Sequence, residues 1–562
     1  MTSETDKQAS AGRTSERVSG KGLLARTSLV GGMTLLSRIL GLVRDVVLAR
    51  FFGASLVMDA FLVANRIPNM LRRFFAEGAF SQGFVPVMAR YREQNSDDEA
   101  REFVDAVAGT FGLVLFVVTL VGVIAAPLLV LIVAPGFVGD DGRFDIATLM
   151  LRFTFPYLFF VSLTAFAGGI LNTYGRFAVP AFTPVLLNVS LIACAIWLSP
   201  MLEEPAMALA YGVFIAGVAQ LLFQLPFLLR LRLLPRPAWK PAHAGVRRVG
   251  ALMLPAIFGS SVAQINVLLG GIIASMLGVG KISLLYFSDR LMEFPLGVFG
   301  IALATVILPT LSRQAASDSM DEFSSTMDWS LRLVLLISVP AAIGLIVLAE
   351  PLVATIFYGG AFSPRDVALT GIALQAFSVG LVGFSLVKIL APAYFAREDT
   401  RTPVRIGLIA LAVNFVLSVL LAWLLTQAGY AAPHAGLALA ISVAAMVNAA
   451  LLYRGLRRDA VIHGEPGWLR YGVQLLVGNA AMVVVLLQFH RSIDWWLDAT
   501  ISARAGWLAV SITAAMVAYF AALFMAGVRP STLKLQKVAC HNHLIWIVGT
   551  DDTQSPCSVT SL

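Results

Sequence analysis

The sequence predicts an all-α polytopic membrane protein with about 14 transmembrane helices, and three observations support this fold class. The 562 residues are 58% hydrophobic and only 13% charged, about half of the ~25% charged residues that are usual in soluble domains. The mean hydropathy is +0.82. The apolar stretches run ~20 residues without the alternation of barrel strands, as helices need to cross ~30 Å of hydrocarbon. This composition excludes a soluble enzyme, a disordered chain and a nucleic-acid-binding module, because too few polar residues remain to cover a soluble surface.

Hydropathy along the chain divides it into spans close to the ~20 residues that a membrane requires. The expected spans are 26–50, 55–80, 104–134, 147–170, 179–199, 206–229, 249–277, 290–311, 331–356, 367–393, 404–426, 433–453, 471–489 and 505–528. The first, second and eighth are polar enough that a hydropathy window would miss them. Within the second, Pro68 is expected to bend or break the helix.

The charges of the loops predict the orientation of the chain in the membrane. Basic residues gather after spans six, ten and twelve: Arg230, Arg232, Arg236, Lys240, Arg247 and Arg248; Arg397, Arg401 and Arg405; Arg454, Arg457, Arg458 and Arg470. Acidic residues gather in two of the intervening loops: Asp140, Asp141, Asp145, Glu203 and Glu204. The loop after span eight is an exception, because Arg313 is followed by Asp318, Asp321, Glu322 and Asp328. Since Lys and Arg concentrate in cytoplasmic loops, we expect both termini in the cytoplasm.

A weak internal repeat suggests two parallel lobes. Pro86–Arg90 and Pro309–Arg313 are similar segments 223 positions apart (309 − 86). Tyr174, Arg176 and Pro184 are echoed by Tyr394, Arg397 and Pro403 at about the same distance. Such repeats are typical of secondary transporters, whose substrate site lies between the lobes. The expected domains are a disordered cytoplasmic tail (1–25), an N-lobe (26–236), a C-lobe (237–460), two additional helices (461–530) and a C-terminal cytoplasmic tail (531–562).

No metal site, cofactor or disulfide framework is expected. Cys194, Cys540 and Cys557 are too few and too scattered for disulfides, and the spacing of His541 and His543 to the last two cysteines fits no standard zinc pattern. The chain has no nucleotide-binding loop, so ATP is not expected to be the direct fuel. The other histidines, His243, His434, His463 and His490, fall in loops or at span ends, where we expect solvated side chains.

Charged residues within the spans point to a binding site. Span one contains Ser37, Arg38, Arg44 and Asp45, in pairs seven residues apart that share one face of a helix. Asp59, Arg66 and Arg73 follow at sevens in span two, and Asp289, Arg290 and Glu293 open span eight. The alternatives are structural ion pairs, or snorkelling to headgroups for Arg50, Arg72, Arg73 and Arg90 near span ends. A cluster of arginines in a membrane cavity suits an anion such as a phosphate or diphosphate.

Several of these segments resemble the MviN/MurJ family of lipid II flippases. The similar segments are Ser37–Asp45, Asp59–Phe61, Pro68–Arg73, Phe75–Gln82, Asp289–Pro295 and Ala391–Tyr394. The resemblance covers about residues 25–530 and excludes the tail past about Val538.

Membership in that family implies a fold of the MOP (MATE-like) exporter superfamily, with two six-helix lobes and two C-terminal helices that form a groove for the lipid tail. It implies flipping of lipid II, the undecaprenyl-diphosphate-linked disaccharide-pentapeptide of peptidoglycan synthesis, from the cytoplasmic to the periplasmic leaflet of the inner membrane. Substrate-binding positions of the family fall on Ser37, Arg38, Arg44, Asp59, Arg72, Ser283, Arg290 and Glu293. The resemblance also suggests proximity to the cell-wall synthesis machinery.

Other functions remain open at this point. A flippase for another polyprenyl-diphosphate-linked oligosaccharide shares the lipid handle, and a cation-coupled multidrug exporter shares the superfamily. A membrane enzyme acting on polyprenyl phosphates is disfavoured, because no Asp-rich motif or paired histidines lie within a span. The coupling ion is also open, since spans seven, eleven and twelve contain no Asp or Glu and offer only Asn414 as a candidate oxygen.

Overall fold

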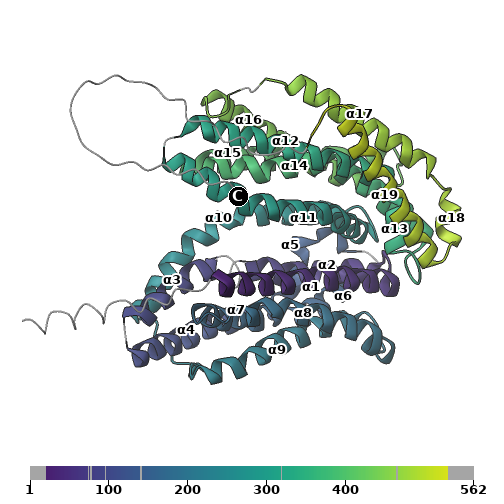
Figure 1. Ribbon diagram of the computed structural model, residues 1–562. Helices are drawn as coiled ribbons and strands as arrows, with labels where there is room; N and C mark the ends of the chain where they lie inside the picture. Colours follow the sequence, from purple (N-terminus) through teal and green to yellow (C-terminus); the bar gives the residue numbers. More distant parts are fainter. Residues whose placement is uncertain are drawn as a thin grey trace, which may run out of the picture.

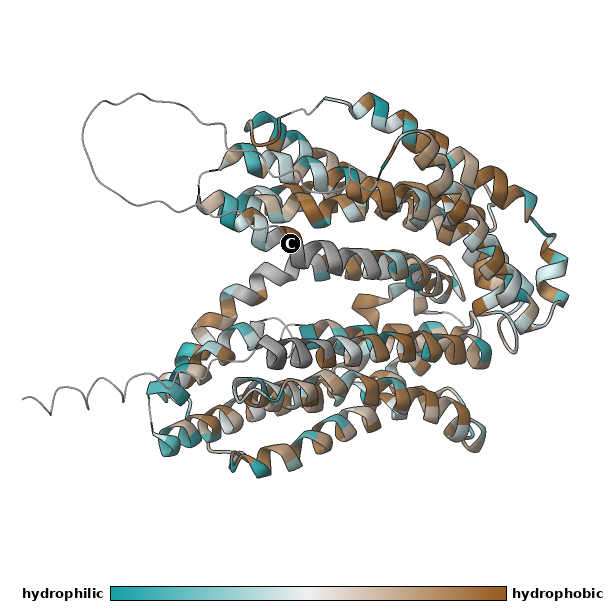
Figure 2. Cartoon of the chain, viewed as in Figure 1, coloured by the Kyte–Doolittle hydropathy of each residue, from teal (hydrophilic) through white to brown (hydrophobic). Residues whose placement is uncertain are grey.

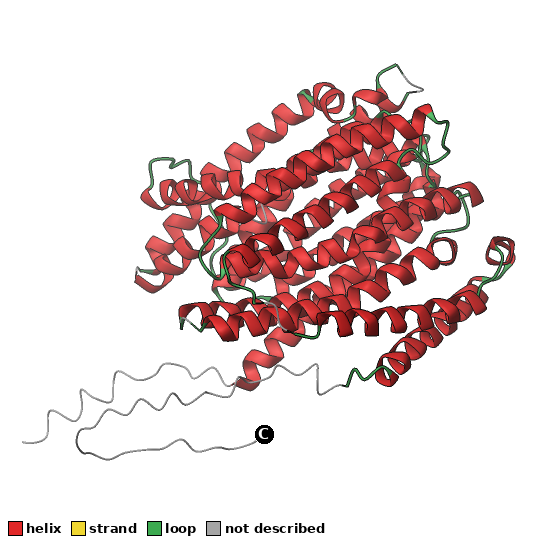
Figure 3. Cartoon of the chain, turned by 90° about the horizontal axis from the view of Figure 1, so that it is seen from above, coloured by secondary structure: helices red, strands yellow, loops and turns green. Residues whose placement is uncertain are grey.

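The computed structural model describes residues 20–529 except 74, 76–78, 95, 140–141, 318 and 464–465. Every regular element within these residues is helical, as Figure 3 shows. The expected N-terminal tail, apart from its last residues, and all but the first of the 32 residues of the expected C-terminal tail lie outside them. The helices are α1 Gly20–Phe52, α2 Leu56–Arg72, α3 Ala79–Gln94, α4 Asp97–Ile124, α5 Ala126–Val133, α6 Arg143–Thr154, α7 Tyr157–Thr173, α8 Ala178–Ala193, α9 Met207–Arg230, α10 Ala244–Ser275, α11 Lys281–Ala316, α12 Met320–Val347, α13 Ala349–Ile356, α14 Pro364–Phe395, α15 Arg401–Gln427, α16 Ala435–Arg458, α17 Trp468–Gln488, α18 Ile493–Asp498 and α19 Ile501–Met525.

The helices form two groups with a crossing helix between them (Figure 1). Helices α1–α9 make the first helix group, in which α1 packs on α8 and α7 packs on α9. Helices α11–α16 make the second helix group, in which α14 packs on α16, α11 and α12. Helix α10 contacts α3 and α4 of the first group and α11 and α15 of the second. A site between α1 and α11 is therefore built from both groups.

The prediction of an all-α membrane protein is confirmed. Ten helices or joined helices within the described residues are long and apolar enough to cross a membrane. Spans one, two and eight are not among these ten, because the charges that we noted in the sequence lie within α1, α2 and α11. In the seventh span, only Gln264–Ser275 qualifies as a shorter apolar helix.

The outer faces of these helices suit lipid. Helix α4 exposes Leu113, Phe116, Leu120 and Ile124 at helical spacing. Exposed large apolar side chains on this scale are unfavourable in water and match the hydrocarbon of a bilayer. Figure 2 shows the same pattern, with hydrophobic colour along the helices and hydrophilic colour at many of their ends.

Pro68 does not end the second span where we expected a bend or a break. Helix α2 continues through Pro68 to Arg72, and the separate helix α3 begins at Ala79. Proline lacks the N–H that would bond to the carbonyl four residues earlier, here that of Ala64. Thr154 of α6 donates its hydroxyl to Ala64 O at 3.2 Å. A neighbouring helix thus supplies the donor that Pro68 lacks.

Two other sequence expectations are corrected. Asp328, which we placed in a loop, lies within α12 and accepts hydrogen bonds from Arg332 Nε and Trp468 Nε1, both at 2.7 Å. This pairing removes one acid from the loop that was an exception to the charge rule. His434, expected to be solvated, is fully buried at the start of α16, with Nε2 3.1 Å from Leu369 O.

The bounds of the helices recur at nearly the same offset as the sequence repeat. Helices α4 and α12 begin and end 223 residues apart (320 − 97 and 347 − 124). Each is followed, after one residue, by an eight-residue helix, and α5 and α13 also begin 223 residues apart (349 − 126). Helices α17–α19 follow the second group and pack on α12 and α13.

Candidate functional site

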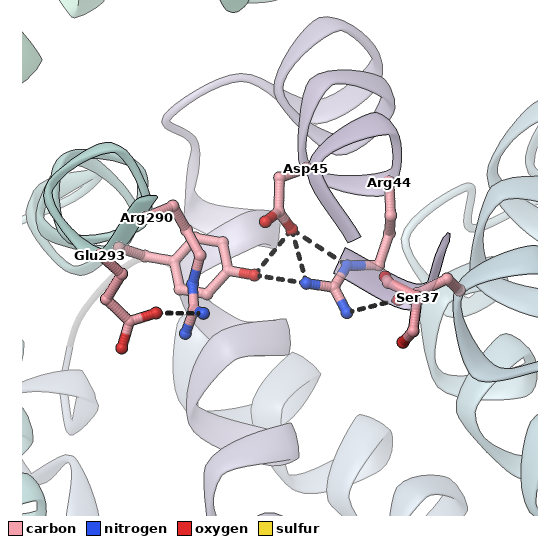
Figure 4. A network of polar contacts seen from close by, with 7 residues as sticks. Ser37, Arg44, Asp45, Arg290 and Glu293 are labelled. Carbon is pink, nitrogen blue, oxygen red and sulfur yellow. Dashed lines mark hydrogen bonds and ion pairs between the residues drawn. The ribbon is translucent and has the colours of Figure 1, made fainter. Parts of the chain in front are cut away.

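Arg44 of α1 lies at the centre of a polar network between the two helix groups (Figure 4). Its Nε and Nη2 donate to Asp45 Oδ1 at 3.0 and 2.7 Å, and its Nη1 donates to Asn188 Oδ1 of α8 at 3.0 Å. Its Nη2 also donates at 3.1 Å to the hydroxyl of Tyr286, which in turn donates to Asp45 Oδ1 at 2.8 Å. Because Tyr286 belongs to α11, these bonds join the two helix groups.

Arg290 lies on the other side of the same tyrosine. Its guanidinium carbon is 5.1 Å from the centre of the Tyr286 ring, and its Nη1 donates to Glu293 Oε2 at 2.7 Å. The Arg290 side chain is 37% exposed and that of Arg44 is 18% exposed. A planar guanidinium at this exposure retains N–H groups for an incoming anion.

Other side chains from both groups surround this pair of arginines. Asn188 Nδ2 donates to the backbone oxygen of Ser37 at 3.0 Å, which fixes α8 to α1. The guanidinium of Arg38 lies so close to Gly297 of α11 that a β-carbon there would clash with it. Lys388 of α14 donates to Leu296 O at 3.3 Å and so adds a cation from a third helix.

Asp59 connects α2 with the first turn of α11. Its Oδ1 accepts from the backbone N–H and the hydroxyl of Ser283 at 2.8 and 2.6 Å, and its Oδ2 accepts from Gly280 N at 2.6 Å. Asp59 and Ser283 are fully buried. A carboxylate that accepts backbone N–H bonds at a helix N-terminus is stabilised by the helix dipole. These residues therefore form a fixed contact between the groups.

Glycines make the backbone approach closely at the same end of the groups. Gly280 has a φ of 81°, and a β-carbon there would lie 2.5 Å from Ala54 O. Ala361 N donates to Arg50 O at 2.7 Å, so the connection between α13 and α14 also contacts the end of α1. We call the contacts of Asp59, Gly280 and Ala361 the inter-group latch.

Arg72 lies in a different place from the Arg44–Arg290 pair. Its Nε donates to Asn69 Oδ1 at 3.2 Å. Its side chain lines a cavity of about 310 Å³ that is walled by α7, α8 and α9 of the first helix group. Of the eight expected site residues, Arg44 and Arg290 meet at Tyr286, Ser37 and Glu293 contact them, Arg38 lies against α11, Asp59 and Ser283 meet in the latch, and Arg72 lines this cavity.

The sequence analysis missed three members of the network. Tyr286 and Asn188 are uncharged, and a search for charges within spans passes over them; Lys388 lies in a span whose other residues are mostly apolar. One signal was available for Tyr286, because it precedes Arg290 by four residues and so shares its helix face. Asn414, noted in the sequence, donates to Asn266 Oδ1 of α10 at 2.6 Å and therefore has a structural partner.

Comparisons with known proteins agree with this architecture. A family profile described as lipid II flippase MurJ matches residues 48–505. A probable lipid II flippase MurJ of Vibrio cholerae is 46% identical over 521 residues, which cover 92% of this chain and 98% of the relative. A lipid II flippase MurJ of Burkholderia cenocepacia is 42% identical over 508 residues, covering 89% and 96% of the two chains.

Solved structures share the fold at lower identity. A lipid II flippase MurJ in an inward closed conformation superposes with a TM-score of 0.70 at 23% identity, covering 88% of this chain and 98% of that chain. An inward-facing multidrug resistance MATE transporter of the MOP superfamily superposes with a TM-score of 0.60 at 14% identity, covering 77% and 98%. The extent of the profile match and the identity over nearly whole chains lead to one conclusion: this chain belongs to the MurJ family of lipid II flippases.

Proposed function

We propose that this protein flips lipid II across the inner membrane, from the cytoplasmic to the periplasmic leaflet, and that an Arg-lined site between its two helix groups binds the diphosphate. Family membership supports the substrate. The observation that carries the site is the meeting of Arg44 and Arg290, from different helix groups, on opposite sides of Tyr286.

The diphosphate replaces existing partners of these arginines when it binds. Glu293 and Asp45 hold the two guanidinium groups in the resting arrangement by bonds of 2.7 Å. An anion with two phosphates offers bidentate oxygens to both arginines at once. The carboxylates then keep the cations oriented and prevent binding so tight that release would fail. Arg38 and Lys388 add positive charge beside the same path.

Alternating access is the motion that this proposal requires, since a large polar head cannot cross ~30 Å of hydrocarbon unshielded. The inter-group latch keeps one end of the path closed. To open that end, Asp59 must give up its bonds to Ser283 and Gly280. Because breaking them leaves a buried carboxylate without donors, opening needs a compensating gain, which anion binding between the groups supplies.

The site contains no constellation that would make the protein an enzyme in this proposal, and its direct partners are lipid II and the surrounding membrane lipids. Both termini face the cytoplasm, where the Arg-rich loops lie. The cell-wall synthesis machinery is the proposed neighbour that consumes the flipped precursor.

The test is exposure of lipid II on the outer leaflet in cells depleted of their own flippase. The wild-type chain is compared with Arg44→Ala and Arg290→Ala at matched membrane levels. We expect the wild type to restore exposure and both variants to lower the rate at least tenfold, because each loses a charged hydrogen-bonding partner of the diphosphate. Ser190→Ala, which alters a hydroxyl bonded to Gly212 O away from the site, is the control for insertion.

Each outcome decides between specific functions. A wild type that leaves lipid II exposure unchanged would transport another substrate, and assays with other polyprenyl-diphosphate oligosaccharides and with cationic drugs then identify it. A wild type and two arginine variants that all restore exposure equally would retain the flippase function and refute the anion site.

A further inference from the structure

The cavity that Arg72 lines is a polar chamber inside the first helix group. Its volume is about 310 Å³, and it opens to the surface of the described chain. Helices α7, α8 and α9 form its walls, and polar side chains face it from each: Thr164 and Asn172, Thr183, and Gln220 and Gln224. A lipid-facing or purely structural void between transmembrane helices is normally apolar, so this lining calls for polar contents.

Two buried acceptors in this cavity have no partner. Gln220 is 3% and Gln224 1% exposed. Gln220 Nε2 donates to Thr183 O at 2.9 Å, which fixes its amide and leaves its Oε1 turned away from that bond. The Oε1 atoms of both glutamines have no hydrogen-bond partner among the described residues. A buried acceptor without a donor costs about 1–3 kcal/mol, so the cavity is built to receive N–H or O–H groups.

The small residue beside Gln224 keeps this acceptor accessible. A β-carbon at Gly168 would lie 3.8 Å from Gln224 Oε1 and 3.3 Å from Pro180 Cβ. A larger side chain at Gly168 would therefore press on Pro180 and fill the space in front of the glutamine. The hydroxyls of Thr164 and Thr183 are already used, since they donate to Phe160 O and Pro180 O at 2.8 Å.

The charges of the cavity select its contents further. Arg72 is the charged side chain in the lining, and no carboxylate accompanies it there. A metal cation is disfavoured beside a guanidinium without an acid, although amide oxygens alone would suit one. A neutral group rich in N–H and O–H donors, attached to an anion that Arg72 attracts, fits both the unpartnered acceptors and the charge.

The position of the cavity also fits a substrate head. Gln224 lies six residues before Arg230, which ends α9 and begins the Arg-rich connection to α10. Six helical residues span about 9 Å, so the chamber is near the end of the helix group that we expect at the cytoplasmic face. A volume of about 310 Å³ is enough for one sugar ring or a short piece of peptide, but not for a whole disaccharide-pentapeptide.

We propose that this chamber is a separate subsite that binds a neutral, donor-rich part of the substrate head, with Gln220 and Gln224 accepting its N–H or O–H groups and Arg72 at its edge. The inference rests on the proposed function and adds to it a recognition site outside the Arg44–Arg290 pair. The shared ligand chemistry is that of an N-acetylated sugar or a peptide, both of which present amide N–H groups beside a diphosphate.

The test measures binding of three ligands to the purified full-length protein in lipid nanodiscs. The ligands are undecaprenyl diphosphate, the same lipid with the disaccharide but no peptide, and complete lipid II. The variant is Gln224→Met, which keeps the volume of the side chain and removes the acceptor. Ser190→Ala serves as the matched control on the adjacent helix α8, and thermal unfolding checks that each variant is folded.

We expect Gln224→Met to weaken binding of complete lipid II about tenfold and to leave undecaprenyl diphosphate unchanged. A loss that already appears with the disaccharide lipid assigns the subsite to the sugar, and a loss confined to complete lipid II assigns it to the peptide. Arg290→Ala weakens all three ligands, because they share the diphosphate.

The failures are distinguishable. A wild-type protein that binds none of the three ligands would refute the proposed function itself. If the wild type binds and Arg290→Ala weakens all three, but folded Gln224→Met binds every ligand like the wild type, the chamber holds only water and the inference is wrong. Equal weakening of all three ligands by Gln224→Met would likewise overturn it, because the glutamine would then act on the diphosphate or on the fold.

Discussion

The two arginines that meet at Tyr286 differ in how fully their hydrogen bonds are satisfied. Arg44 donates four hydrogen bonds to three side chains, and Arg290 donates one to Glu293 while its Nε is buried without a partner. Arg44 thus serves the resting structure as well as the proposed ligand, whereas Arg290 is held mainly by one ion pair and the face of a ring.

Lysine substitutions should separate these two roles. Arg44→Lys keeps the charge but cannot reproduce the fork of bonds to Asp45, Asn188 and Tyr286, and we expect it to lower both thermal stability and the flipping rate, the stability by about 1–3 kcal/mol. Arg290→Lys should leave stability nearly unchanged and lower the flipping rate about tenfold, because a lysine contacts phosphate as a point charge. Thermal unfolding and lipid II exposure are measured on the same preparations. Equal losses of stability in both variants would contradict this division.

The charged residues of the site were found from the sequence because charge within a span is costly and therefore conspicuous. The uncharged partners were not, since Tyr286 and Asn188 look like ordinary members of their helices. The sequence also could not show that Arg72 faces a cavity within one helix group instead of the Arg44–Arg290 pair. That separation depends on how α3, α7, α8 and α9 pack, which no spacing along the chain determines.

At the scale of whole helices, sequence reasoning located the apolar segments well and their interruptions poorly. The expected span 104–134 is divided into α4 and α5, and 331–356 into α12 and α13. Neither division carries a proline or glycine at the break, which falls at Ala125 and Leu348. Conversely, Pro68 suggested a break that a hydroxyl from α6 prevents. Tertiary contacts decide these cases, so local propensity alone does not predict them.

The latch offers a test at this scale, in the connection that joins α10 to α11. Gly280→Ala places a β-carbon 2.5 Å from Ala54 O and forces an unfavourable φ of 81°. We expect it to loosen the contact between α2 and α11 and to expose the buried Ile282, measured as faster thiol labelling of an Ile282→Cys reporter.

Gly278→Ala is the matched control for that substitution. Gly278 also has a positive φ, of 95°, but a β-carbon there meets nothing within 4 Å. The control therefore adds backbone strain in the same connection without the clash. If Gly278→Ala and Gly280→Ala speed labelling equally, strain alone explains the effect and the close approach of Ala54 does not hold the latch.

For the whole molecule, helices α17–α19 form an attachment to the second helix group and not a free appendage. Trp468 Nε1 bonds to Asp328, Tyr471 donates to Arg332 O at 2.6 Å, and Tyr519 donates to Leu336 O at 2.7 Å. All three partners lie on α12. The proposed role of this region is a groove for the lipid tail, which places the tail against one group while the head lies between the two.

Truncation should distinguish that role from a purely structural one. A chain that ends at residue 460 is expected to lose affinity for undecaprenyl diphosphate while it still binds a diphosphate on a short prenyl chain, because only the long chain needs the groove. A chain that ends at residue 529 retains α17–α19 and should bind both ligands like the full-length protein. If the shorter chain remains folded in thermal unfolding and binds both ligands normally, the groove is not part of the binding site.

The recurrence of helix ends 223 residues apart has an evolutionary consequence. Breaks at Ala125 and Leu348 occupy matching positions although their surroundings have diverged, so they date from a shared ancestral half that was duplicated and fused. The offset rises to 228 only at α9 and α16 (435 − 207), while α8 and α15 still begin 223 apart (401 − 178). The insertion that separates the two copies is therefore confined to the final hairpin of each half. Descent has preserved the scaffold on both sides and assigned the polar chamber to one side alone.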